Sequence, residues 1–154
     1  MIERAATKLR HDGWTIVETT GFIHLIGPLW ERKVDESHEF ALVAQDKHQN
    51  RRGMVQGGVM MTFADRTCGM MARYASGRQF MATVQLDTHF VEAGKIGDIL
   101  ISRPRVVRST RSLSRDSRLD QRKLRALLVQ GVDGMVDRTI ERISVGEGLV
   151  CEMV

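Results

Sequence analysis

The segment from residue 57 to residue 75 constrains the fold more than any other part of the chain. Almost every position in it is apolar or small, and the pair Gly57-Gly58 opens it. Such a run predicts one helix, and a helix that is apolar on all sides is a buried helix. Asp65 lies in its middle. Because an unpaired charge is costly to bury, this carboxylate requires either a partner or a chemical role.

Length and composition indicate one domain spanning residues 1–154. The chain is 42% hydrophobic and 27% charged, an ordinary balance for a globular protein. Its two cysteines, Cys68 and Cys151, are widely separated and suggest neither a disulfide framework nor a zinc site, which fits a reducing compartment. The N-terminus lacks the apolar core of a signal peptide, and no apolar run is long enough to span a bilayer. We therefore expect a cytoplasmic protein.

The other elements are predicted from periodicity and turn residues. Apolar residues at helical spacing predict a short helix over residues 1–12. Alternation predicts a strand over 80–91, in which Leu86 and Phe90 share the face that covers the long helix. A strand is expected at 98–109, and Pro104 predicts that it lies at an edge or carries a bulge. Further expected segments are strands at 14–18, 21–30 and 38–46, a polar loop at 47–53, two last strands between 111 and 132, and a loose tail at about 137–154.

These elements predict an α+β fold in which one long central helix is wrapped by a curved antiparallel sheet of five to six strands. The connection at 93–97 is short, so the strands on either side of it are expected to be antiparallel neighbours. One sheet leaves an apolar helix incompletely covered. A second copy of the chain would complete its burial, and we therefore expect a homodimer.

The region around the start of the helix resembles a known family. The sequence NRRGMVQGG at residues 50–58, followed by Asp65, resembles the N-x-x-G-x-x-H-G-G pattern and helix aspartate of the hotdog-fold acyl-CoA thioesterases, specifically the phenylacetyl-CoA thioesterase (PaaI-like) branch. The flanking segments GFIHLIGPLW and EAGKIGD are also similar, so the resemblance covers roughly residues 21–112. It implies the hotdog fold and hydrolysis of an acyl-CoA to a free acid and CoA.

The sequence departs from the family pattern in two places. Gln56 stands where the family has histidine, and glutamine hydrogen-bonds but does not titrate near neutral pH. A weaker or shifted site follows if that histidine acts chemically. Beyond about Leu113 the chain is richer in arginine and alternates less than the family's last strands. This second departure bears on those strands and on the CoA site.

Thioester hydrolysis requires a polarised carbonyl, an attacking water or carboxylate, and a place for CoA. The Gly57-Gly58 pair lies at the predicted start of the helix, where free N–H groups and the helix dipole stabilise an oxyanion. A tight turn is the alternative reason for these glycines. Asp65 is the candidate general base or nucleophile. Its alternative is a core carboxylate paired with a cation such as Arg66.

The resemblance assigns roles to two further residues. It implies that Asn50 holds the water or the thioester carbonyl, and that Thr83 supplies the hydroxyl that orients the water. Without the resemblance, Asn50 is an ordinary turn residue and Thr83 an ordinary β-branched strand residue.

The spacing of Gly57 and Asp65 makes the expected dimer part of the mechanism. Eight residues of helix separate them by about 12 Å, which a single thioester does not easily bridge. Two antiparallel helices in a dimer would set Gly57 of one subunit beside Asp65 of the other. The resemblance implies the same shared site, in a dimer or a tetramer.

Candidate groups for substrate binding are less specific. From residue 103 to residue 125 the chain carries nine Lys/Arg and two Asp, a net charge of +7, which attracts phosphates but is also typical of a solvated face. The expected substrate-binding residues are Gly58, Met61, Arg103, Arg105 and Arg108. His48 and His89 are expected on the surface or in a strand. No spacing of His, Asp and Glu suggests a metal, and no cofactor is expected.

Three other functions stay open at the level of sequence. A hotdog hydratase or dehydratase requires a histidine paired with an acid, and none stands at the start of the helix. A non-catalytic module that binds acyl-CoA, or an inactive relative, is favoured by Gln56 and by the unusual C-terminal third. A nucleic-acid binder would use the +7 segment, but that segment contains no aromatic residue for base stacking. We therefore expect an acyl-CoA partner, aromatic or aliphatic, and neither nucleic acid nor membrane.

Overall fold

The computed structural model describes residues 2–90, 92–108, 127–130, 135–136 and 149–153. The elements in chain order are α1 (Ile2–His11), β1 (Thr15–Val17), α2 (Gly21–Ile26), β2 (Leu29–Val34), β3 (Ser37–Val43), the 3-10 helix η1 (Asp46–His48), α3 (Gly57–Ser76), β4 (Thr83–Thr88), β5 (Ile99–Ser102), β6 (Arg105–Arg108), β7 (Leu127–Gln130), β8 (Met135–Val136) and β9 (Leu149–Met153).

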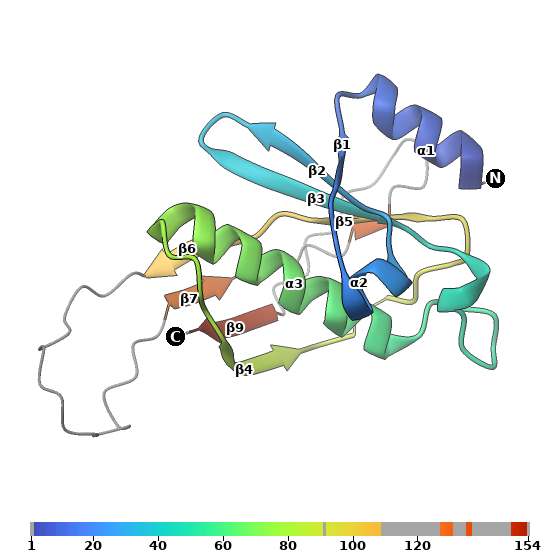
Figure 1. Ribbon diagram of the computed structural model, residues 1–154. Helices are drawn as coiled ribbons and strands as arrows, with labels where there is room; N and C mark the ends of the chain where they lie inside the picture. Colours follow the sequence, from blue (N-terminus) through green and yellow to red (C-terminus); the bar gives the residue numbers. More distant parts are fainter. Residues whose placement is uncertain (1, 91, 109–126, 131–134, 137–148, 154) are drawn as a thin grey trace, which may run out of the picture.

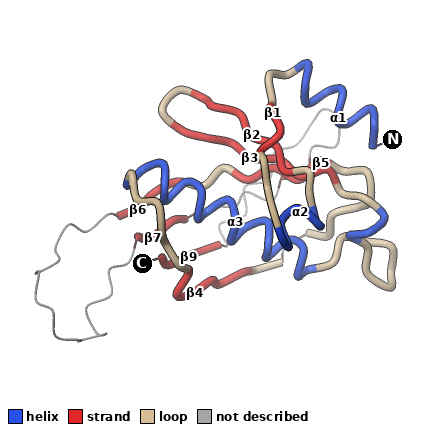
Figure 2. The backbone as a smooth tube through the Cα atoms, in the orientation of Figure 1, coloured by secondary structure: helices blue, strands red, loops and turns tan. Residues whose placement is uncertain are grey.

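The described strands pair into two antiparallel groups. One has the order β1-β2-β3-β5-β8 and the other the order β4-β9-β7-β6, and α3 lies along both (Figure 1, Figure 2). The groups separate between β5 and β6, at Arg103 and Pro104. Proline has no N–H to donate to a neighbouring strand, and the single strand expected over 98–109 is divided here into β5 and β6.

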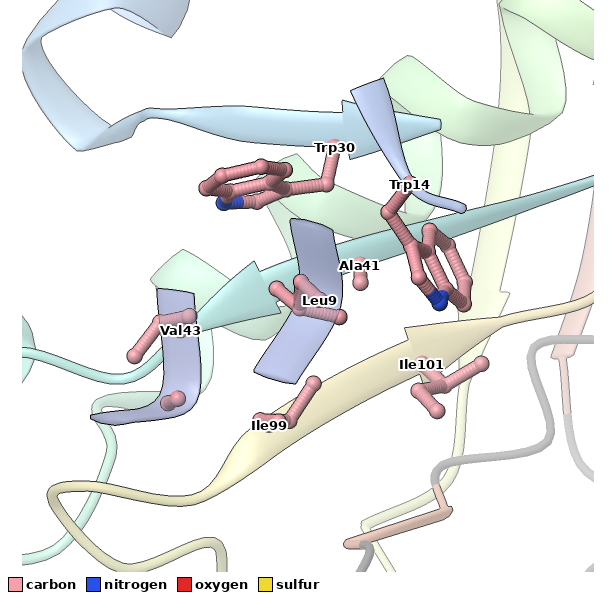
Figure 3. Close-up of a cluster of buried hydrophobic side chains, with 8 residues drawn as sticks. Leu9, Trp14, Trp30, Ala41, Val43, Ile99 and Ile101 are labelled. Atoms are coloured by element: carbon pink, nitrogen blue, oxygen red, sulfur yellow. The ribbon is translucent and has the colours of Figure 1, made fainter. Parts of the chain in front are cut away.

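The first two residues of β2, the last four of β3 and all of β5 are buried, and successive side chains along them point to opposite faces of the sheet. Phe40 and Leu42 of β3 and Leu100 of β5 pack with α3. The alternate residues pack with α1, which covers the outer face of the sheet (Figure 3). This outer cluster consists of Ala5, Leu9, Trp14, Trp30, Ala41, Val43, Ile99 and Ile101.

The long helix α3 is buried on two sides. Phe63 and Met70 face the first group of strands. Cys68 lies in a cluster with Leu86 of β4 and Val106 of β6, which belong to the second group. Its outer side is open in the single chain, where Met61 is 38% exposed. The predicted long helix against antiparallel strands is therefore confirmed, as is its incomplete cover.

Segment 21–30 differs from its prediction. Gly21–Ile26 forms helix α2, and only Leu29 onwards is a strand. A short apolar run does not by itself distinguish a helix from a strand. The predicted single strand is therefore wrong over its first eight residues, six of which are helical.

The pairing around residues 93–97 also differs from its prediction. β4 pairs with β9, and β5 pairs with β3 and β8, so the strands that flank this turn are not neighbours. β9 lies in the segment expected as a loose tail, while residues 137–148 fall outside the described part. β7 lies where one of the two last strands was predicted, and residues 109–126 are outside the described part.

Candidate active site

Asp65 and Thr83 meet directly. The Thr83 hydroxyl donates to Oδ1 of Asp65 over 2.5 Å, joining the middle of α3 to the first residue of β4. Asp65 is half-buried, and its charge acts on neighbouring Arg66, although within the described residues the two side chains form no close ion pair. A carboxylate held at one oxygen by a hydroxyl keeps its other oxygen for a water molecule.

The start of α3 presents two amides. Oε1 of Gln56 accepts from the Val59 amide over 3.0 Å and caps the helix. A Cβ on Gly58 would lie 2.7 Å from that Oε1, so a larger residue at position 58 would push the capping side chain aside. The amides of Gly57 and Gly58 make no hydrogen bond within the described residues. They are donors of the kind that stabilises an oxyanion.

Phe90 is a residue at this site that the sequence did not reveal. A Cβ on Gly57 would lie 3.1 Å from Cζ of the Phe90 ring. The alternation at 80–91 assigned Phe90 to a buried face, but β4 ends at Thr88 and Phe90 is 55% exposed. The alternation therefore stops before Phe90, and its ring lies against the start of α3 instead.

Asn50 has the turn role that its residue type suggests. Its Oδ1 accepts from the amides of Arg52 and Met54, over 2.8 and 3.2 Å. Its side-chain nitrogen makes no hydrogen bond within the described residues. Asn50 is thus fixed by its oxygen and presents an N–H donor.

His48 is not the surface or strand residue that the sequence predicted. It is 1% exposed, with Nε2 2.8 Å from the Ile26 carbonyl and Nδ1 3.0 Å from the Gln45 amide. These partners require Nε2 to carry the proton and Nδ1 to accept. Burial lowers the pKa of His48, and the charge of nearby Lys47 lowers it further. The hydrogen bond to the Ile26 carbonyl raises the pKa but does not outweigh burial. The ring is fully engaged and is not a general base, whereas His89 is exposed.

The predicted substrate-binding residues are spread over the molecule. Met61 lies one helical turn before Asp65, on the exposed side of α3. Nε of Arg103 is 2.6 Å from Glu39, which Arg32 also contacts. Burial opposes ionisation of Glu39, but hydrogen bonds from these two arginines outweigh it and lower the pKa. Arg105 is exposed, and the side chain of Arg108 is outside the described part.

A surface pocket of about 810 Å³ opens between segment 16–28 and α3. Lys47 and Arg66 supply cations to its lining, and Glu18 supplies a carboxylate. Burial lowers the pKa of Arg66, and the charge of Arg73 lowers it further. Tyr74 and Asp65 raise it but do not outweigh these two effects. None of the five predicted catalytic residues lines this pocket.

Two further searches cover the described residues alone. No group of three or more His, Cys, Asp or Glu is placed to hold a metal ion there. None of the helices in that part of the chain combines the length and apolarity needed to cross a bilayer.

Comparisons with known proteins show what this chain is similar to. The family model of the thioesterase superfamily matches residues 52–115. Zebrafish thioesterase superfamily member 2 is similar in structure, with TM-score 0.61 and 15% identity over 99% of this chain and 96% of that one. A phenylacetic acid degradation-related protein of Ralstonia eutropha gives TM-score 0.59 and 20% identity over 96% of each chain. No curated protein sequence matches.

The fold is therefore the hotdog fold, and the resemblance to the thioesterase superfamily is confirmed over residues 52–115. A hypothetical thioesterase of Streptococcus pneumoniae, solved with coenzyme A, is a further match, with TM-score 0.57 and 17% identity over 81% of this chain and 80% of that one.

Proposed function

We propose that this chain is an acyl-CoA thioesterase that uses Asp65 as its general base or nucleophile. The observation that carries the proposal is the hydrogen bond from Thr83 to Asp65, on the same helix that opens with the unpaired amides of Gly57 and Gly58. A positioned carboxylate and free helix amides are the two elements that thioester hydrolysis requires. The match to the thioesterase superfamily supports the same reaction.

In the general-base form, Asp65 accepts a proton from water while the water oxygen forms a bond to the thioester carbon. The Gly57 amide stabilises the negative charge that develops on the carbonyl oxygen. When the carbon–sulfur bond breaks, the CoA thiolate leaves and takes up the proton. In the nucleophile form, Asp65 attacks first and water then hydrolyses the acyl-enzyme anhydride.

We assign supporting roles to two neighbours. The Thr83 hydroxyl fixes the rotamer of Asp65, so the free carboxylate oxygen faces the water. The side-chain N–H of Asn50 is a donor for the water or the thioester carbonyl. Gln56 caps α3 and acts through the position of the glycine amides, because its oxygen is already bonded to Val59.

The proposed active unit is a homodimer. Gly57 and Asp65 are about 12 Å apart along α3, so the amide that polarises the carbonyl and the carboxylate belong to different subunits. The exposed side of α3, with Met61, is available for a second copy. For the CoA phosphates we propose Arg105, whose side chain is exposed.

The test is release of free CoA from a panel of aromatic and aliphatic acyl-CoAs, followed with a thiol reagent. Removing a general base or nucleophile costs at least about 100-fold, so Asp65→Asn is expected to lose that much of kcat/KM. Asp87→Asn is the matched control, since Asp87 is an exposed carboxylate on the same strand as Thr83.

Two results would oppose the proposal. If no acyl-CoA is cleaved above the rate of the protein-free solution but acyl-CoA still binds, the chain is a non-catalytic acyl-CoA-binding module. If Asp65→Asn keeps the full rate, the carboxylate is not the catalytic group.

A further inference from the structure

The loop between η1 and α3 is a short ladder of backbone pairs with His48 at its base. The Gln56 amide donates to the His48 carbonyl over 2.8 Å, Gln49 bridges Val55, and the Asn50 amide donates to the Met54 carbonyl over 2.7 Å. The ladder joins Asn50 near its tip to Gln56 at the start of α3. A shift of its base therefore moves Asn50 and the glycine amides together.

The His48 side chain ties this base to helix α2. Its Nε2–H donates to the carbonyl of Ile26, the last residue of α2, and Lys47 donates to the next carbonyl, of Gly27, over 2.8 Å. Carbonyls at a helix C-terminus have no partner inside the helix, so both bonds satisfy groups that the helix leaves open. Nδ1 meanwhile accepts from the Gln45 amide, which fixes the ring plane.

The ring can make both bonds in only one form. Neutral imidazole with the proton on Nε2 donates to Ile26 and accepts from Gln45, whereas the protonated ring would set an N–H against the Gln45 amide. The ring is 1% exposed, so no space is left for water to replace a lost partner. The loop geometry thus depends on one tautomer of one side chain.

We propose that His48 is a positioning residue for the thioesterase site. This role rests on the proposed function, and the His48 side chain itself touches no reacting atom. Through its bond to Ile26 and through its own carbonyl, it sets where Asn50 and the Gly57 amide lie relative to the thioester. Misplacement of catalytic groups by about 1 Å costs on the order of 100-fold in rate. The loss therefore appears in kcat rather than in KM.

The test compares two replacements of His48 with a matched control. His48→Leu keeps the size of the side chain but neither polar contact, and His48→Gln keeps an N–H that reaches Ile26. His24→Gln is the control, because His24 is an exposed histidine on α2, the helix that the His48 ring contacts. We expect His48→Leu to lower kcat about 10- to 100-fold with little change in KM. We expect His48→Gln to recover most of that loss and His24→Gln to behave as the wild type.

A second measurement does not need activity. Hydrogen exchange of the Gln56 amide reports its bond to the His48 carbonyl. We expect this exchange in His48→Gln to be faster than in His24→Gln, because the Gln45 amide loses its acceptor on the ring, but slower than in His48→Leu. Nitrogen-15 NMR of the wild-type ring is expected to show the proton on Nε2. Unchanged kcat in a folded His48→Leu, or unchanged Gln56 exchange, would overturn the proposal. If the wild type cleaves no thioester but Gln56 exchange changes in the His48 variants, the proposed function fails. The link from His48 to the loop and to α2 is then still supported.

Discussion

At the scale of single residues, the site is defined by which neighbour each polar group finds. Asp65 is bonded to Thr83, Gln56 to the Val59 amide, and Asn50 to its own turn. Each residue type was visible in the sequence, but its partner was not. The partner distinguishes a carboxylate that is available for water from a glutamine whose oxygen is occupied in capping.

Replacing Thr83 separates its hydroxyl from its shape. Thr83→Val keeps the β-branched form but leaves Asp65 without its hydrogen bond, and we expect kcat/KM to fall about 10-fold because the base loses its fixed rotamer. Thr83→Ser keeps the hydroxyl and is expected to stay within about threefold of the wild type. Rates on the preferred acyl-CoA decide this, and equal activity of the valine and serine variants would contradict it.

The buried ring of His48 predicts a pH effect on stability. Its pKa in the folded protein is lowered from the ordinary value of about 6.5, so the unfolded chain binds the proton first. Stability is then fully present above pH 6.5 and is lost as the pH falls, by up to about 1.4 kcal/mol per pH unit until the folded pKa is reached. Urea unfolding at pH 7.5 and 5.5 should show a larger loss for the wild type than for His48→Gln. An equal loss of stability in the two proteins would show that folding does not lower the pKa of His48.

At the scale of elements, α3 is the part of the fold that the others are built on. Its two buried sides meet different groups of strands, and its open side carries Met61. One buried polar contact crosses from it to the sheet: Thr67 and Ser102 lie 2.8 Å apart between their hydroxyl oxygens, and both residues are 0% exposed. Polar contacts of this kind fix the register of a helix on its sheet.

Breaking that contact tests the docking of α3. Thr67→Val keeps the volume but leaves the buried Ser102 hydroxyl without a partner, at a cost of about 1–3 kcal/mol in the free energy of unfolding. Thr67→Ser keeps the hydroxyl, so its loss is expected to be smaller. Denaturant unfolding of the two variants measures the difference, and a valine variant as stable as the serine one would refute the role.

At the scale of the whole molecule, the proposed function makes the single chain an incomplete active unit. The glycine amides and Asp65 occupy distant turns of one helix, and the outer side of that helix is open. A second copy with an antiparallel helix would bring the two groups together. The dimer that we propose thus completes both the cover of the helix and the site.

Mixing two inactive variants tests the shared site. Gly57→Ala places a Cβ 3.1 Å from Phe90 and obstructs close approach of the thioester, while Asp65→Asn removes the base. In a mixed dimer one of the two sites has neither change, so an equal mixture should recover about a quarter of the wild-type activity. Light scattering would confirm the dimer, and differently tagged subunits would show that mixed dimers form. No recovery in mixed dimers would place the whole site within one subunit.

The sequence by itself determined the long helix, its start at Gly57 and the hotdog family resemblance, because each is encoded in local spacing. It also singled out Asp65 and Thr83, though not their contact. Tertiary structure alone decided the helical state of Gly21–Ile26, the separation of β4 from β5, and the burial of His48. The physical reason is that these features depend on partners far away in the chain. Short apolar runs fit a helix or a strand equally well, and the Ile26 carbonyl that buries the His48 ring lies 22 residues from it.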